Sequence, residues 1–446
     1  MSDCGRRRLT SGKVGKPPLL PAVLVLLVAA SCADPPPEVF EHRVWDSAGV
    51  ELIETGSPAF AGDEGWEIAP DPILELGQRD GTEPFLFSRI WDALLLPDGR
   101  IVVSDNHEPH VRIFGADGSH LSSFGRPGEA PMDFGAPPML AYIAPDTLLT
   151  WDPHFYRLSR YDFEGNLLDQ LSMNTRIREE YALPHIFGAA VWQLGSDGSL
   201  LWTGSLTAHL ESEGFYEITL DPILFGSDDD PVVFDPLPLS HAFGFRVSDG
   251  FVGRIFNPFL HRATAVRGQD PGVVVSAPSE LPEVVYHGAS GETLRILRAP
   301  VPRSPVSRSM VRDERVELGE RVLTWSGPVT PAQAQDAFDG LPIPDSLPAF
   351  QGLHIAPSGN IWTERRTAEA DDQMVFDIFA GEDGRWLSTV RAPLGVRRIL
   401  AIGPEAVLTE YLDDLGVPHI RLYPVERPSG WHQALQTEVD AADRSP

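Results

Sequence analysis

Cysteine is scarce in this chain, whose 446 residues include only Cys4 and Cys32. A framework of several disulfide bonds is therefore excluded, and a fold of this size must be held together by its apolar core. If the residues before Cys32 are removed, Cys32 is the only cysteine left, which makes its position informative.

Long hydrophobic runs are also missing. The apolar stretch from Leu19 to Ala30 is interrupted by Pro21 and is shorter than the ~20 residues that a membrane-spanning helix needs. It follows a basic start and leads into a short run of small residues, Ala29-Ala30-Ser31-Cys32. This order of basic, apolar and small residues is typical of a secretory signal peptide.

The residues around Cys32 resemble a bacterial lipobox, except that Ala29 stands where Leu is usual. The resemblance implies a lipoprotein signal peptide over residues 1–31. It also implies an acylated Cys32 at the start of a proline-rich tether, residues 32–42, that attaches the protein to a membrane. Ala33 after the cysteine implies the outer membrane of the cell envelope. An ordinary secretory signal with an incidental cysteine is the alternative.

Positive charge is low, with 35 Lys and Arg against 64 Asp and Glu and a formal net charge of −29. Removal of the basic leader makes the remaining body more acidic still. A body of this charge argues against nucleic acid as a partner. The chain also lacks the Gly-x-Ser-x-Gly, His-Glu-x-x-His, Walker and dinucleotide-binding motifs, so no common catalytic signature is present.

What the chain does contain is an internal repeat. Residues in two neighbouring stretches match at a constant offset of 47 positions: Asp105 and Asp152, His107 and His154, Phe114 and Tyr161, Gly118 and Gly165, and Leu121 and Leu168. Each stretch reads as strand, Asp-x-His corner, strand, Gly turn and strand. A period of this length, with 40 Gly and 42 Pro along the chain, is typical of a β-propeller.

Weaker copies of the unit predict six blades over residues 43–426, beginning near Ile90, Pro138, Phe187, Phe243, Phe350 and Gly395. Seven blades are the alternative. The strand Val50–Ile53 is expected to complete the last blade and close the ring. Gly residues such as Gly99, Gly198 and Gly359 are expected to take positive φ in turns.

One segment, residues 302–347, lacks strand alternation and is expected to be a helical, proline-rich insertion between the fourth and fifth blades. Thr330-Pro331-Ala332-Gln333 has a Thr cap, a Pro in the first turn and a Gln three residues after the cap, which predicts a helix start. The polar residues 427–446 are expected to be a flexible tail.

The stretch Phe124–Phe134, after the Pro97-Asp98-Gly99 turn, resembles an NHL repeat. The chain from 42 to 426 is similar to the bacterial six-bladed β-propeller lipoproteins related to NHL proteins, as Asp383-Gly384-Arg385-Trp386-Leu387 also indicates. The resemblance implies an all-β, six-bladed NHL-like propeller with a small helical insertion. It carries no settled biochemical function for the group.

The Asp-x-His corners are the main candidate site. Asp105, Asp152, His107, His154 and His110 are expected near the face that holds propeller ligands, and His185 and His241 could join them. Imidazoles gathered there would suit zinc, and in NHL-like lyases histidines from several blades hold a metal. In the alternative interpretation, both Asp side chains accept backbone N–H groups in their turns. Gly226-Ser227-Asp228-Asp229-Asp230 is a weaker candidate for calcium.

Two functions follow from these features, beside a third interpretation as a structural envelope protein with no small ligand. The first is a non-catalytic binding or interaction scaffold at the cell envelope, with a protein, peptide or glycan ligand. The second is a metal-dependent propeller enzyme, namely a lyase, lactonase or hydrolase. Side chains at the ring axis distinguish them, because an enzyme needs several His, Asp or Glu side chains around one point.

Overall fold

The computed structural model describes residues 42–106, 110–174, 177, 191–204, 214–226, 230–248, 251–260, 264–268, 273–277, 282–323, 329–367 and 373–428. Their strands form six sheets. The first sheet contains β5 (Ile90–Leu95), β6 (Ile101–Asp105), β7 (His110–Phe114) and β8 (His120–Phe124). The second contains β9 (Met139–Ile143), β10 (Thr147–Asp152), β11 (Arg157–Tyr161) and β12 (Leu167–Ser172).

The third sheet contains β13 (Val191–Leu194), β14 (Leu200–Gly204), β15 (Gly214–Phe225), β16 (Val232–Val233), β17 (Leu237–Ser248) and β18 (Phe251–Phe256). The fourth contains β19 (Thr264–Arg267), β20 (Val274–Ala277), β21 (Glu283–His287) and β22 (Thr293–Arg298), extended by β2 (Val50–Thr55) and β1 (His42–Ser47).

The fifth sheet contains β23 (Phe350–Ile355), β24 (Ile361–Arg365), β25 (Val375–Phe379) and β26 (Trp386–Arg391). The sixth contains β27 (Val396–Ile402), β28 (Ala406–Leu412) and β29 (Pro418–Glu426), extended by β3 (Glu67–Ile68) and β4 (Leu74–Leu76).

The core consists of apolar layers between consecutive sheets, and strand alternation produces them. Leu148 packs toward the first sheet and its neighbour Leu149 toward the third, because successive side chains of a strand point to opposite faces. Val274 and Val275 likewise divide between the third and fifth sheets. An apolar layer of this kind lies between each pair of consecutive sheets, and a sixth layer joins the sixth sheet to the first. The sheets therefore close into a ring, and the predicted all-β propeller fold is confirmed.

Glycines at the repeated turns have the expected backbone conformation. Gly99, Gly198 and Gly359 have φ of 85°, 82° and 84°. A side chain is strained at such angles, so glycine is required where the turn connects two antiparallel strands.

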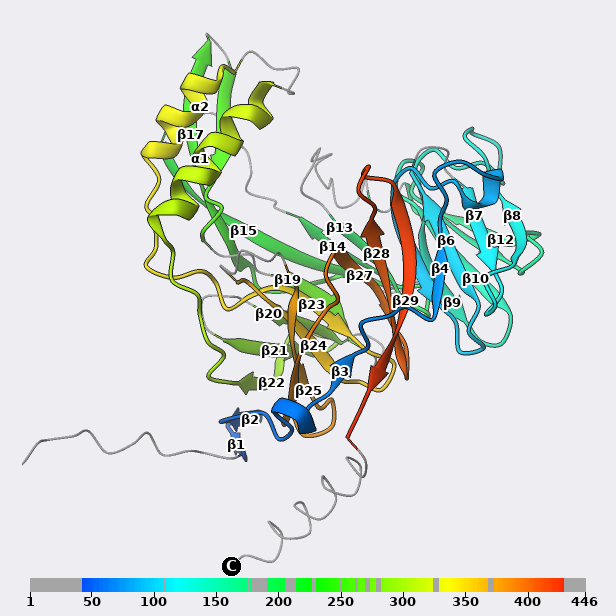
Figure 1. Cartoon of the computed structure of the whole chain (residues 1–446), viewed down its shortest axis with the longest axis horizontal. Coiled ribbons are helices and arrows are strands. Elements are labelled where there is room, and N and C mark those ends of the chain that lie inside the picture. Colours follow the sequence, from blue (N-terminus) through cyan, green and yellow to red (C-terminus); the bar gives the residue numbers. More distant parts are fainter. Residues whose placement is uncertain are drawn as a thin grey trace, which may run out of the picture. The chain divides into compact units, whose positions relative to one another are not determined.

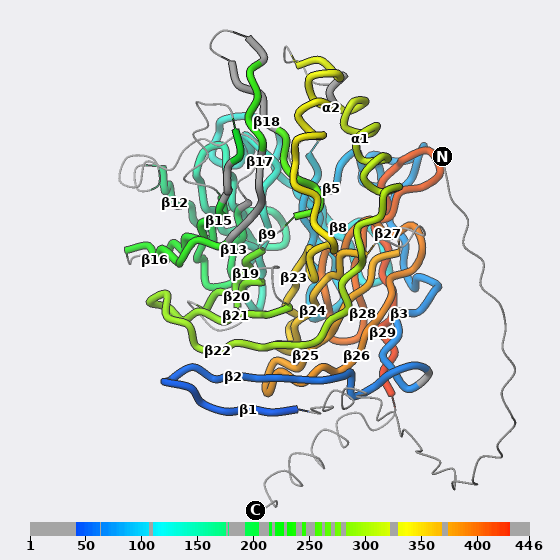
Figure 2. The backbone as a smooth tube through the Cα atoms, turned by 90° about the vertical axis from the view of Figure 1, so that its left-hand side faces the viewer, coloured from blue at the N-terminus to red at the C-terminus, as the bar shows by residue number. Residues whose placement is uncertain are grey.

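The predicted role of Val50–Ile53 is wrong. This segment lies in β2, which pairs in parallel with β22 at the outer edge of the fourth sheet. Figure 2 shows β1 and β2 beside β22. The sixth sheet is instead extended by β3 and β4, further along the chain. Leu76 of β4 is buried between the sixth and first sheets, so an N-terminal segment does complete the last sheet, but a different one.

The predicted start of a fourth blade near Phe243 is also wrong, because Phe243 lies in β17 of the third sheet and the fourth sheet begins with β19. β15 and β17 are long antiparallel strands that extend this sheet. The helical insertion packs against this extension. It consists of α1 (Arg308–Leu323) and α2 (Pro331–Asp339), which lie beside β17 (Figure 1) and share an apolar cluster with it and β18.

The helix predicted from Thr330 is confirmed. Thr330 is the N-cap of α2, its hydroxyl accepts the Gln333 N–H, and the Gln333 side chain accepts the Thr330 N–H in return. Ala334, Ala337 and Phe338 face the cluster and are buried.

Candidate ligand site in the central channel

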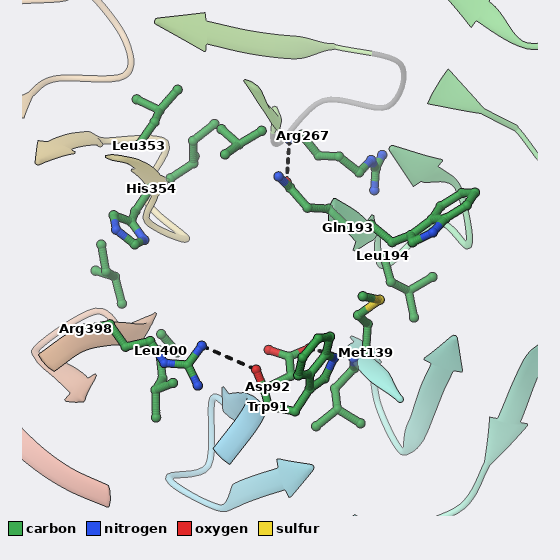
Figure 3. Close-up of a pocket in the computed structure, with 16 residues that line it drawn as sticks. Trp91, Asp92, Met139, Gln193, Leu194, Arg267, Leu353, His354, Arg398 and Leu400 are labelled. Atoms are coloured by element: carbon green, nitrogen blue, oxygen red, sulfur yellow. Dashed lines mark hydrogen bonds between the residues drawn. The ribbon is translucent and has the colours of Figure 1, made fainter. Parts of the chain in front are cut away.

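The innermost strands of all six sheets surround a channel with a volume of about 650 Å³. These strands are β5, β9, β13, β19, β23 and β27, each at one edge of its sheet. Figure 3 shows their side chains pointing toward a common open space. A volume of this size is in the range of pockets that bind small molecules.

The lining is chemically uneven around the ring. The first three sheets contribute the large aromatic and thioether side chains Trp91, Met139 and Trp192. The three basic side chains of the lining, Arg267, His354 and Arg398, come from the fourth, fifth and sixth sheets. The remaining wall is mostly aliphatic, formed by Leu140, Leu194, Val266, Leu353, Ile355, Leu400, Ala401 and Ile402.

Asp92 on β5 joins two sheets. Its Oδ2 accepts the Leu140 N–H of the second sheet at 2.8 Å, and its Oδ1 accepts the Ala93 N–H at 2.9 Å. Burial raises the pKa of Asp92 to about 6, and the two backbone bonds and Arg398 oppose this rise. The carboxylate therefore positions the neighbouring strand and changes charge near neutral pH.

Arg398 joins the sixth sheet to the first. Its guanidinium donates to the Trp91 carbonyl at 3.5 Å and to the Ile90 carbonyl, and its Nε donates to Glu410. Its side chain is still 42% exposed. Figure 3 shows it reaching across the channel edge toward Trp91 and Asp92. Because a guanidinium has five N–H groups, some donors of Arg398 are available to a ligand.

Gln193 and Arg267 join the third sheet to the fourth. The Gln193 side chain accepts the Arg267 N–H at 3.2 Å and donates to the Ala265 carbonyl at 2.9 Å. The Arg267 guanidinium pairs with Asp197 at 2.9 Å and lies directly over Gly195, where an added Cβ would fall 1.0 Å from Nη1. Glycine at 195 therefore makes room for this ion pair.

His354 on β23 faces the open space from the fifth sheet (Figure 3). Burial lowers its pKa to about 4, so the imidazole is neutral at physiological pH. Its ring lies edge-on to Phe376, with 6.1 Å between the ring centroids. A neutral imidazole can both donate and accept a hydrogen bond.

The carboxylates of Asp105 and Asp152, at the corners predicted from the repeat, are buried and form hydrogen bonds within the fold. Asp105 accepts the Ser88 N–H and hydroxyl at 3.0 and 2.8 Å, and Asp152 accepts the Gly135 N–H at 2.8 Å. In each case the partner lies 17 residues earlier, in the segment that enters the same sheet. Asp152 also accepts two N–H groups of its own turn, from His154 and Phe155. Both carboxylates therefore fix the connections between sheets.

The predicted histidines are not all described. His107 and His185 lie outside the described residues, as do Ser227, Asp228 and Asp229 of the calcium candidate, and only the backbone of His241 is described. His154 is exposed, and His110 lines a separate pocket of about 220 Å³ with Asp105 and Arg112. Within the described part of the chain, no group of three His, Cys, Asp or Glu residues is arranged to hold a metal ion. A metal role for these residues stays a prediction.

One pair has the form of a catalytic dyad. The Ser276 hydroxyl lies 2.8 Å from Nε2 of His287, whose pKa burial lowers. Ser276 is, however, fully buried on β20, which pairs with β21. A nucleophile needs access to its substrate, so this contact serves to satisfy two polar groups inside the sheet.

Sequence reasoning missed the channel residues. Asp92, Gln193 and His354 each stand on the strand just before a Gly-containing turn, and the turns themselves were recognised in the sequence. The polar residues upstream of those turns were the available signal.

No family model matches the chain, and no curated protein matches it. Solved structures with a similar fold include an exported protein from Bacteroides fragilis NCTC 9343 (11% identity, 84% of this chain and 99% of that one, TM-score 0.43). A DUF4221 family member from Bacteroides vulgatus has 9% identity over 82% of this chain and 99% of that one, with a TM-score of 0.45. A catalytically inactive virginiamycin B lyase from Staphylococcus aureus has 9% identity over 80% and 99%, with a TM-score of 0.37.

Identities and TM-scores this low say nothing about the ligand of this chain. Among the described residues, no helix is both long and apolar enough to cross a membrane.

Proposed function

We propose that this protein is an envelope-anchored, six-bladed propeller of the NHL-like type that binds a ligand in its central channel without transforming it. The observation that carries the proposal is the channel itself, to which all six sheets contribute aromatic, aliphatic and a few polar side chains. A concave wall that combines apolar side chains with a small number of fixed polar groups is typical of a binding site.

The polar groups of the wall support binding rather than catalysis. The carboxylate of Asp92 is engaged by two backbone N–H groups, and Arg398 and Gln193 also bond to the backbone of a neighbouring sheet. Groups held in this way are rigid and preorganised, which reduces the entropic cost of binding. They are not arranged as a nucleophile with an adjacent base.

The blade count, the NHL relationship and the anchor are parts of the same proposal. The 47-residue repeat and the matching hydrogen bonds of Asp105 and Asp152 support the NHL relationship. The blade count of six takes each described sheet as one blade. Lipidation at Cys32 and an outer-membrane location rest on the sequence pattern alone. The ligand would be a small molecule, or the end of a peptide, glycan or protein chain that enters the channel.

The test is to purify the full chain from the organism that encodes it and to identify retained small molecules by native mass spectrometry. Leu400→Trp fills the channel and should abolish retention, whereas Leu415→Trp at a 66% exposed turn position is the matched control. Equal retention by both variants, or release of a chemically altered molecule on incubation, would overturn the proposal.

A further inference from the structure

We infer that the channel ligand is a neutral sugar, whose ring packs on the tryptophan side of the channel while its hydroxyls bond to the polar side. This inference rests on the proposed channel-binding function and assigns its ligand class. Three observations support it: the distribution of aromatic side chains around the channel, the pairing of the charged side chains, and the hydrogen-bond donors and acceptors that remain for a ligand.

The aromatic groups provide the first step. Trp91 and Trp192 line the channel from the first and third sheets, with Met139 between them in chain order. The Trp192 ring packs against Trp151, with 5.1 Å between the ring centroids, and against Phe225, with 6.0 Å between them. The indole of Trp192, fixed in this way, offers a flat apolar surface of the kind on which the C–H face of a sugar ring can lie.

The pairing of charges is the second step. Arg267 is paired with Asp197, and Arg398 with Glu410. Asp92 lies on the side of the channel that Arg398 reaches, and Arg398 acts on it electrostatically. Each fixed positive charge of the lining thus already has a carboxylate partner. An anionic ligand would have to compete with Glu410 and Asp92, and a cationic ligand would meet two guanidinium groups.

The remaining hydrogen-bonding capacity is the third step. Arg398 retains N–H donors beyond its three hydrogen bonds, His354 offers one donor and one acceptor, and the carboxylate oxygens of Asp92 each keep a lone pair. Donors and acceptors therefore occur together. Neighbouring hydroxyls of a sugar donate and accept in the same way, whereas a hydrocarbon ligand would leave these groups without partners.

The experiment is a titration of disaccharide probes into the full chain in detergent. Binding is measured by tryptophan fluorescence and by calorimetry. The neutral probes are cellobiose, maltose, lactose and N,N′-diacetylchitobiose. Cellobiouronic acid and deacetylated chitobiose are matched anionic and cationic probes. We expect at least one neutral disaccharide to bind with an affinity about ten-fold higher than that of either charged probe.

Variants locate the binding. Trp91→Ala should weaken the binding of that disaccharide by about ten-fold, which corresponds to the loss of about 1.4 kcal/mol of stacking. Trp45→Ala, at an exposed position of β1, is the matched control and should leave binding unchanged.

Three results would overturn the inference in distinguishable ways. Preference for a charged probe that Leu400→Trp abolishes would overturn the sugar assignment and leave the channel as the binding site. If a neutral sugar binds and Leu400→Trp does not affect that binding, both the assignment of a sugar to the channel and the channel as the binding site would be contradicted. Failure of all four neutral sugars to bind at 50 mM would overturn the sugar assignment, while retention of another molecule would still support the channel.

Discussion

At the scale of single residues, the two titrating groups in the channel have opposite effects on stability. Burial lowers the pKa of His354 to about 4 from 6.5, so the unfolded chain binds a proton between these values that the folded protein does not. The stability due to neutral His354 is therefore present above pH 6.5 and is lost as the pH falls toward 4. Asp92 acts in the other direction, because burial raises its pKa to about 6 from 3.8 and the folded state holds the proton more strongly.

We expect His354→Gln to remove one of these two contributions. Relative to the wild type, the free energy of unfolding of the variant should rise by about 1 kcal/mol when the pH is lowered from 8 to 5. The full pKa shift would give more, but the side chain has access to water in the channel. Urea unfolding at the two pH values measures this difference. His154→Gln replaces an exposed histidine as the control, and an equal change in both variants would refute the argument.

At the scale of elements, α2 depends on its first turn. Replacing Thr330 with Ala removes the hydroxyl that accepts the Gln333 N–H, and we expect a loss of about 1 kcal/mol in the local stability of the helix. Hydrogen exchange of the α2 amides should become faster, with little change in the six sheets. Thr330→Ser keeps an accepting hydroxyl and should restore slow exchange; fast exchange in the Ser variant as well would show that the cap does not stabilise α2.

The elements also show how far the sequence predicts this fold. Turns and the start of α2 were predictable because Gly99 or Thr330 acts through its own local conformation. α1 was not predicted, because its sequence between Arg308 and Leu323 is rich in Arg and Glu and has little apolar periodicity. It is stabilised by packing on α2 and on the apolar cluster that both helices share with β17 and β18, which is a tertiary effect that its own residues do not show.

At the scale of the whole molecule, the ring and the channel both depend on residues far apart in the chain. Ile420 and Leu408 of the sixth sheet pack with Leu76 and Ile90, and the channel lining extends from Trp91 to Ile402. Each inner strand contributes only two to four residues to the lining. No short motif could reveal such a site, whereas the repeat could reveal the sheets that assemble it. The assignment of Val50–Ile53 failed for the same reason, since several N-terminal strands could pair with an open sheet edge.

Attachment to a membrane is the last property of the whole molecule that the sequence predicts. If Cys32 carries the lipid, Cys32→Ser should move the protein from the membrane fraction to the soluble fraction of the envelope, because two or three acyl chains are needed for stable anchoring. The propeller should remain folded, since the six apolar layers between the sheets include neither cysteine. Fractionation with immunodetection measures the location, and an unchanged thermal transition shows that the fold is intact. Cys4→Ser lies in the predicted leader and should leave the location unchanged; a Cys32→Ser protein that stays with the membrane would exclude anchoring by this residue.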